Sequence, residues 1–225
     1  MKRSLINKEI ELAMDLCRDL GFALPDFAYW TPEEWEAKED ITERMRKVAL
    51  GWDVTDYNSN DFDRRGAVLF TLRNGEMSDP SRPYCEKMIA MKEGQELPFH
   101  FHYYKTEDII NRAGGVLCVQ VYNSTSEEDG YQFDTESDVE LYLDGIKHVI
   151  PAGGTVKITN GNSITLTPYV YHRFYAEGGP LVVGEVSRVN NDATDNHFIE
   201  DTGMTIQEDE PIRHNLCGGY ITKSE

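Results

Sequence analysis

Two histidines separated by one residue are the first feature of this sequence that could do chemistry. His100 and His102 stand in an aromatic-rich run that favours a strand. Residues two apart on a strand project to the same face, so both imidazoles can point at one ion. Glu107 follows off the parity of that strand and can join them only if the chain turns or bulges between Tyr103 and Thr106. The segment therefore predicts a metal site with three candidate ligands.

A fourth candidate ligand, His172, comes from a distant part of the chain. It follows Pro168 and the turn signal Asn160-Gly161, at the start of a predicted strand. Two strands would then close the site. Three neutral imidazoles and one carboxylate suit a divalent first-row metal, with one or two positions left for water or substrate.

Lys105 and Glu185 could supply chemistry that a metal cannot. Lys105 closely follows His102 and is either a solvated lysine at the rim or a cation beside developing negative charge. Glu185 interrupts the apolar run Leu181–Val186, so it faces either solvent or the interior. Inside, burial would raise its pKa, whereas the metal and Lys105 would lower it. Such a carboxylate can move a proton next to a carbonyl, which is aldose–ketose isomerisation.

The elements that must position these side chains are short strands, which begin near residue 67. No helical segment separates them, which excludes a parallel βαβ sheet and favours an antiparallel sandwich or barrel. Turn signals between strands include Asn74-Gly75, Asp144-Gly145 and Gly178-Gly179. The candidate strands are Ala67–Leu72, Lys87–Met91, Phe99–Tyr103, Val116–Tyr122, Val139–Leu143, Lys147–Ile150, Thr155–Thr159, Ser163–Thr167, His172–Ala176 and Leu181–Val186.

The first third of the sequence favours helices. Apolar residues from Ile6 to Leu20 recur at a spacing of three and four, and Gly21 stands where such a helix would end. Thr31-Pro32-Glu33-Glu34 combines an N-cap threonine, a proline at the first helical position and a glutamate at the third, which is a capping box. Residues Ile41 to Leu50 favour a third helix.

We expect one domain with three parts, since 225 residues suffice to bury a sizeable core. Residues 1–65 are expected to form a helical extension packed on a barrel, and residues 66–190 to form that barrel. Residues 191–225 are polar and acidic, and we expect them to wrap the barrel as irregular structure.

Composition excludes several classes of partner. The chain has 22 Lys and Arg against 40 Asp and Glu, a formal charge of −18, so nucleic acid and anionic membrane surfaces would be repelled. No run approaches the ~18 consecutive apolar residues of a spanning helix, and the first residues do not resemble a signal peptide. The four cysteines form no CxxC pair. We therefore expect buried thiols in a cytoplasmic protein.

Five positions resemble the first signature motif of the cupin superfamily, G-x5-H-x-H-x4-E-x6-G, at every specified residue. They are Gly94, His100, His102, Glu107 and Gly114. The second cupin motif is less well kept, because Pro168 precedes His172 by four residues instead of five. The resemblance implies an all-β core in the form of a cupin barrel, that is, a double-stranded β-helix or jelly roll.

A closer resemblance covers nearly the whole chain. Residues His100–Arg112 resemble the H-F-H-x-x-K-x-E-D-I-I-N-R core of the bacterial D-lyxose isomerases. Leu24–Trp35, Leu50–Asp56, Leu69–Gly75 and Glu185–Asn196 are also similar to that family, apart from Asn191-Asp192, where family sequences often have two aspartates. The resemblance implies a cupin barrel with an N-terminal helical extension, assembled as a homodimer.

The same resemblance implies roles for individual residues. Family members interconvert D-lyxose and D-xylulose, with side activity toward D-mannose and D-fructose, and prefer Mn²⁺. The residues themselves leave Zn²⁺, Co²⁺, Ni²⁺ and Fe²⁺ open, because divalent ions bind most sites of this kind in nearly the same order. Lys105 and Glu185 would be the acid–base pair, and Asp195 would contact a sugar hydroxyl. The implied metal ligands are His100, His102, Glu107 and His172.

The leading interpretation is a metal-dependent aldose–ketose isomerase that transfers a proton through a cis-enediol. Two other classes could carry the same ligands: a cupin iron dioxygenase, and a sugar-binding cupin without chemistry. The sequence does not choose between proton transfer and a hydride shift.

Overall fold

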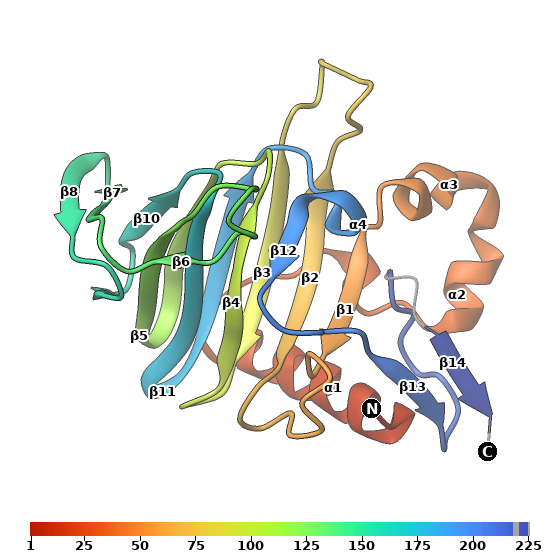
Figure 1. Ribbon diagram of the computed structural model, residues 1–225. Coiled ribbons are helices and arrows are strands. Elements are labelled where there is room, and N and C mark those ends of the chain that lie inside the picture. Colours follow the sequence, from red (N-terminus) through yellow and green to blue (C-terminus); the bar gives the residue numbers. More distant parts are fainter. Residues whose placement is uncertain (218–220, 225) are drawn as a thin grey trace.

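Antiparallel strands make up most of the fold, which the computed structural model describes for residues 1–217 and 221–224 (Figure 1). The helices are α1 (Arg3–Asp19), the 3-10 helix η1 (Asp26–Ala28), α2 (Pro32–Ala37), α3 (Glu39–Lys47) and α4 (Asp192–Asp195). The strands are β1 (Gly51–Thr55), β2 (Ala67–Asn74), β3 (Cys85–Met91), β4 (Glu96–His102), β5 (Glu107–Ser124), β6 (Phe133–Asp134), β7 (Val139–Leu143), β8 (Ile146–Ile150), β9 (Thr155–Ile158), β10 (Ser163–Leu166), β11 (Val170–Ser187), β12 (Asn196–Phe198), β13 (Thr205–Glu208) and β14 (Ile221–Ser224).

Two long strands, β5 and β11, hold the barrel together. They are antiparallel partners from Val170 opposite Asn123 to Ser187 opposite Glu107. The first half of β11 pairs with β4 and the second half with β3, so the two halves belong to different layers. One layer has the strand order β1-β2-β3-β11-β5-β10-β7-β8 and uses the second half of β11 and the first half of β5. The other layer contains β12, β4, the first half of β11, the second half of β5, and β9. The predicted cupin barrel is confirmed, and its interior lies between these layers.

Glycines allow β5 and β11 to bend while they stay paired. The register shifts between Glu177 and Leu181, beside Gly114 and Gly115 of β5. A Cβ on Gly114 would lie 2.3 Å from the Pro180 carbonyl oxygen, closer than real Cβ atoms approach backbone. Gly178-Gly179 was expected to end one strand and begin another, and this expectation is wrong. The pair is a bulge within β11, because a bulge bends a strand without breaking its ladder.

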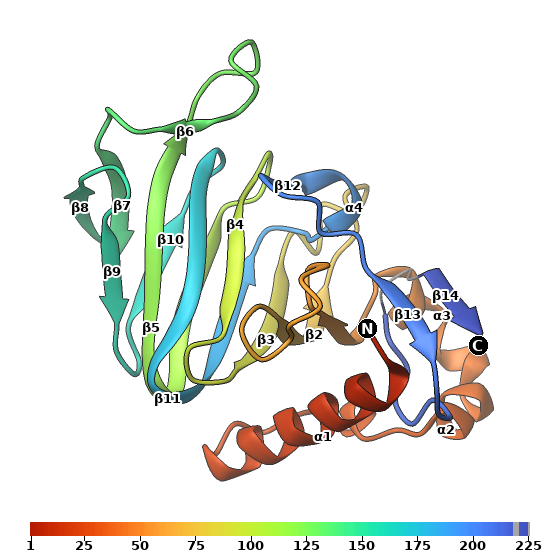
Figure 2. The same cartoon turned by 60° about the horizontal axis from the view of Figure 1, so that its bottom comes forward.

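Side chains of the first layer alternate between two cores. One face of β1, β2 and β3 packs with β4, β5 and β11 around the barrel interior. The other face packs against α1, whose buried residues include Ile6, Ile10, Ala13 and Cys17. Figure 2 shows α1 lying across β1, β2 and β3. The predicted apolar face of the first helix is therefore the face that covers the sheet.

The N-terminal helices agree with their sequence signals. Gly21, just after α1, has a φ of +74°, a conformation that favours glycine. At α2 the Thr31 hydroxyl accepts from the Glu34 N–H at 3.3 Å, and the Glu34 carboxylate accepts from the Thr31 N–H at 2.9 Å. The capping box is therefore confirmed.

Besides the two-residue strand β6, two segments contain strands that the sequence patterns did not indicate. Residues 51–55, expected within the helical extension, form β1 as the neighbour of β2. In the C-terminal tail, expected to be irregular, β12 pairs with β4, and β13 pairs in parallel with β14. Long-range partners hold the described part of the tail, including an ion pair between Glu208 and Arg3 of α1 at 2.8 Å.

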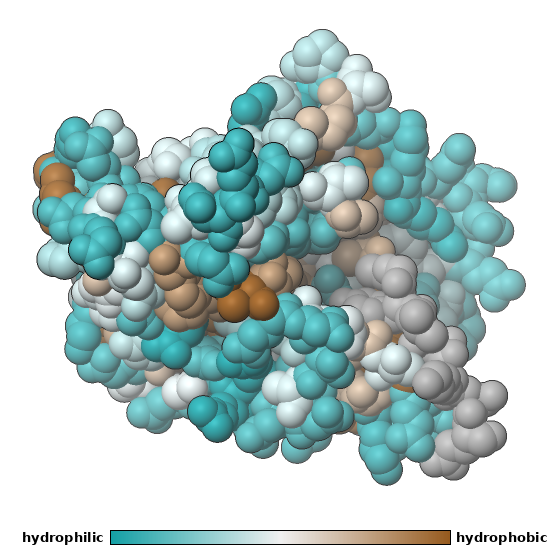
Figure 3. Space-filling model, in the orientation of Figure 1, coloured by the Kyte–Doolittle hydropathy of each residue, from teal (hydrophilic) through white to brown (hydrophobic). Residues whose placement is uncertain are grey.

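The surface agrees with the acidic, polar composition. Figure 3 shows a face that is mostly hydrophilic, with brown side chains only in small groups. Among the described residues, no helix is both long and apolar enough to cross a bilayer.

Candidate active site

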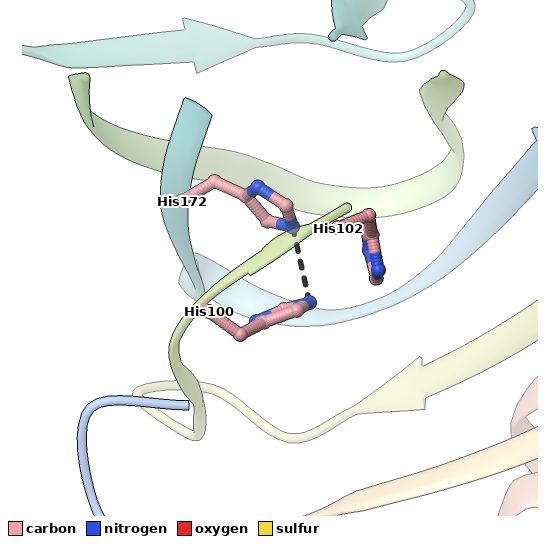
Figure 4. Close-up of side chains that lie close together, drawn as sticks. All are labelled: His100, His102 and His172. Atoms are coloured by element: carbon pink, nitrogen blue, oxygen red, sulfur yellow. Dashed lines mark hydrogen bonds between the residues drawn. The ribbon is translucent and has the colours of Figure 1, made fainter. Parts of the chain in front are cut away.

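Three imidazoles converge in the barrel interior. His100 and His102 project from the same face of β4, and His172 projects from the neighbouring strand β11 (Figure 4). His172 and His100 are directly opposite in the strand register. One nitrogen from each ring can be chosen so that all three lie within 4.8 Å of one another, and all three residues are buried. The group could therefore hold a metal ion.

Glu107 joins this group from the first residue of β5. Its carboxylate oxygens lie 3.3 Å from the His102 Nε2 and 3.2 Å from the His172 Nε2. The chain leaves the strand at Tyr103 and re-enters one at Glu107, so the predicted turn between them is present. All four predicted ligands thus lie side by side.

The hydrogen bonds of the rings fix the tautomers of His100 and His172. The His100 Nδ1 is 2.9 Å from the Pro98 carbonyl, and the His172 Nδ1 is 3.0 Å from the Val170 carbonyl. Because a carbonyl only accepts, each Nδ1 carries the proton and donates it. The two Nε2 atoms, 3.0 Å apart, then turn lone pairs toward each other, which no hydrogen bond can satisfy.

The electrostatics also fit a bound cation. Burial, together with the neighbouring His172 and His102, lowers the pKa of His100 well below its ordinary value. Burial also lowers the pKa of His102, so these two rings are neutral at physiological pH, as metal ligands must be. Burial alone would raise the pKa of Glu107, but His102 and Lys105 outweigh it and hold that pKa well below its ordinary value. Neutral imidazoles beside an ionised carboxylate suit a divalent first-row ion.

Lys105 and Glu185 lie next to this group and not at the surface. Lys105 is 3% exposed and Glu185 is 5% exposed. The Lys105 ammonium donates to Glu185 at 2.8 Å and lies 3.2 Å from Glu107. Burial would favour a neutral amine, but the charges of Glu185 and Glu107 raise the pKa of Lys105 above its ordinary value. Of the two alternatives left open for each residue, the interior one is observed.

A second lysine, which no sequence pattern indicated, lies beside Glu185. Lys87 of β3 is opposite Glu185 in the register, with its Nζ 3.9 Å from the Glu185 carboxylate. The same ammonium donates to Asn190 at 2.8 Å and lies 3.5 Å from Asp192. One feature of the sequence could have indicated this lysine. It is a charged residue in the apolar run that forms β3, two positions before Ile89, so both side chains point into the barrel.

These residues line one cavity of about 240 Å³. His100, His102, Glu107, Lys105 and Glu185 are all in its wall. The volume suits a small molecule rather than a polymer, although such pockets in proteins are often larger. The cavity brings an ionised carboxylate, a fixed cation and a candidate metal site to one small space.

Asp195 lies elsewhere. One of its carboxylate oxygens accepts the Tyr104 N–H at 2.7 Å, and its carbonyl accepts the Tyr103 N–H at 3.0 Å. These bonds brace the turn that carries Lys105. Asp195 lines a separate depression near the catalytic cavity, while Asp192 and Asn196 line the cavity itself. The sugar contact expected of Asp195 stays a prediction.

The fold and its interior site define a cupin-type barrel whose histidine group could hold a metal ion. Comparison with known proteins narrows the class. The family model described as D-lyxose isomerase matches residues 1–220. The D-lyxose/D-mannose isomerase of Escherichia coli O157:H7 is 39% identical over 98% of each chain. The enzyme of the same name from Serratia proteamaculans is 38% identical, also over 98% of each chain.

The chain therefore belongs to the D-lyxose isomerase family, and it is a sugar ketol-isomerase. A solved structure supports the fold independently. The L-ribose isomerase of Cellulomonas parahominis, without ligand, aligns with a TM-score of 0.52 at 17% identity, covering 90% of this chain and 94% of that chain.

Proposed function

We propose that this protein is a metal-dependent isomerase that interconverts D-lyxose and D-xylulose, and also D-mannose and D-fructose. The observation that carries the proposal is the position of Glu185. Its carboxylate is buried, lies 2.8 Å from the Lys105 ammonium, and lines the same cavity as His100 and His102. The substrates are those implied by the family resemblance and by the names of the two relatives.

We propose that His100, His102, Glu107 and His172 hold a divalent ion, with Mn²⁺ as the first choice. The facing Nε2 lone pairs of His100 and His172 support this assignment. An ion held there would act as a Lewis acid on the carbonyl and hydroxyl oxygens at C1 and C2 of an open-chain sugar.

Glu185 acts as the base in this proposal. Its carboxylate takes the proton from C2 of the aldose and returns it to C1, while the hydroxyl proton moves from O2 to O1. This sequence converts the aldose to the ketose through a cis-enediol.

Lys105 stabilises the negative charge that develops during the transfer. The ammonium is fixed between Glu185 and Glu107, so it need not reorganise when charge appears on the sugar oxygen. Since its pKa is raised, it acts as a lasting cation rather than as a ready proton donor.

The homodimer and the cytoplasmic location are also proposals. The homodimer rests on the family resemblance, and light scattering of the purified protein tests it. The location is supported by free thiols at all four cysteines, which suit a reducing compartment.

The decisive experiment loads the metal-free protein with Mn²⁺ and incubates it with a panel of pentoses and hexoses. We expect D-xylulose from D-lyxose and a slower formation of D-fructose from D-mannose. The same reaction under argon should proceed at the same rate. Failure to form a ketose from any aldose, or a requirement for Fe²⁺ and O₂, would overturn the proposal in favour of a binding protein or a dioxygenase.

A further inference from the structure

We propose that Asp53 of β1 binds the hydroxyl group at the far end of the open-chain sugar and thereby selects neutral, unphosphorylated substrates. The inference rests on the proposed function, because it takes the reacting carbons to lie between Glu185 and the imidazoles. Asp53 lies within Leu50–Asp56, a segment similar to the D-lyxose isomerases, but the resemblance assigns it no role.

Strand parity aims Asp53 at the cavity. Trp52 and Val54 of the same strand are buried in the layer against α1. Asp53 and Thr55 therefore face the opposite way, into the barrel, and both line the catalytic cavity. At the matching positions of the two neighbouring strands, the side chains that face the barrel are apolar: Leu69 and Ile89. The carboxyl group of Asp53 is therefore unusual on this face.

Within the described part of the chain, one oxygen of Asp53 lacks a partner. The Oδ1 atom is buried and has no hydrogen bond to residues 1–217 or 221–224. Over the same residues Asp53 makes no ion pair, although Lys87 lines the same cavity. Buried polar atoms are nearly always satisfied, and an exception in a cavity wall indicates a ligand that satisfies it.

The register sets Asp53 at the opposite end of the cavity from Glu185. Asp53 is opposite Leu69, which is opposite Ile89, which is opposite Val183. Glu185 is on the same strand and face as Val183, so three strand spacings, or about 14 Å of sheet, separate the two backbones. Because both side chains point into the cavity, the distance between their carboxyl groups is shorter than this. An open-chain sugar that lies over Leu69 and Ile89 could then contact both groups.

The charges at this end favour a hydroxyl over a phosphate. Asp192 lines the cavity beside Asp53, and two carboxyl groups would repel a phosphate. Burial and the charge of Asp192 raise the pKa of Asp53 to about 7, against the opposing effect of Lys87. Near neutral pH this carboxyl can accept or donate a hydrogen bond, which matches a hydroxyl group that does both.

The test compares D-lyxose with 5-deoxy-D-lyxose, which lacks the terminal hydroxyl. In the wild type, kcat/KM should fall by roughly 10- to 100-fold for the deoxy sugar, the usual cost of losing a hydrogen bond to a charged group. Asp53→Ala and Asp53→Val should lose this preference, to within about threefold, mainly through a higher KM for D-lyxose. D-lyxose 5-phosphate should not be a substrate of the wild type.

Asp61→Asn, at an exposed position, is the control and should keep the full preference for D-lyxose over the deoxy sugar.

Each other outcome overturns a defined step. Asp53 variants that keep the wild-type preference, or a wild type that turns over both sugars equally, would refute the contact. Since the Oδ1 atom of Asp53 is buried and unpaired among the described residues, both variants should unfold at least as high in temperature as the wild type, and loss of folding would contradict the inference. Absence of any ketose from D-lyxose in the wild type would instead refute the proposed function.

Discussion

The Lys105 ammonium lies 2.8 Å from the Glu185 carboxylate, although 80 residues separate them in the chain. The same nitrogen is 3.2 Å from Glu107, so one lysine connects the proposed base to a proposed metal ligand. This contact forms because the turn after β4 points Lys105 inward, toward the second half of β11.

Replacement of Glu185 tests the base directly. Glu185→Gln keeps the shape of the side chain but removes its ability to take a proton, so kcat should fall by roughly 10²- to 10⁴-fold. Substrate binding should change little, and the wild type should incorporate solvent deuterium at C1 of the ketose while the variant does not. Glu177→Gln on the same strand, exposed and paired with Lys157, is the matched control and should retain full activity. Complete retention of the substrate hydrogen by the wild type would point to a hydride shift instead.

Metal removal should lower the thermal stability as well as the activity. A ligand that binds only the folded state at 100 times its Kd adds about 2.7 kcal/mol to the free energy of unfolding. Calorimetry with and without Mn²⁺ should therefore show a higher unfolding temperature for the loaded wild type. His172→Ala removes one buried ligand, so its unfolding temperature should not respond to Mn²⁺. An equal metal response in both proteins would show that the ion binds elsewhere.

The metal-free protein should lose stability as the pH falls below about 6.5. Burial and the neighbouring histidines lower the pKa of His100 in the folded state, while the unfolded chain titrates near 6.5. Below that pH the His100 imidazole binds a proton in the unfolded chain but not in the folded protein. The free energy of unfolding that this group contributes above pH 6.5 is therefore lost on acidification. Between pH 7.5 and 5.5 the loss should be about 1.4 kcal/mol for this group.

Urea unfolding at a series of pH values measures this slope. His100→Asn keeps a donor for the Pro98 carbonyl but cannot titrate, so its slope should be shallower. His148→Asn, on the distant strand β8, should leave the slope unchanged. The lowered pKa of Glu107 acts only in more acidic solution, whereas the pKa of Asp53, raised to about 7, acts in this window with the opposite sign. The contribution of His100 is therefore the difference in slope between the wild type and His100→Asn. Identical slopes in all three proteins would contradict the assignment.

The contact of α1 with the sheet should contribute strongly to stability. Ile10 is fully buried between α1 and the sheet, so Ile10→Ala should lower the free energy of unfolding by about 2 to 5 kcal/mol. Leu12 lies on the same helix and is 44% exposed, so Leu12→Ala should cost much less. Urea denaturation of both variants compares the two faces, and equal losses would mean that the helix does not pack as described.

Some of the site could be predicted from sequence because its causes are local. The spacing of His100 and His102 and the parity of a strand are enough to aim both rings at one point. The turn before Glu107 follows from its mismatch with that parity. The capping box at Thr31 and the apolar face of α1 are also local, since they depend on residues three or four positions apart.

Only the tertiary structure decided which side chains share the cavity from distant strands. Lys87 reaches it because β3 pairs with β11, and Asp53 reaches it because β1 is joined to β3 through β2. The register of these strands comes from pairings between segments far apart in the chain. The same long-range pairing keeps Gly178-Gly179 inside one bent strand and draws β12 onto β4. Hydrogen bonds between strands are satisfied by whichever segment the folded chain brings alongside, so no local pattern records the partner.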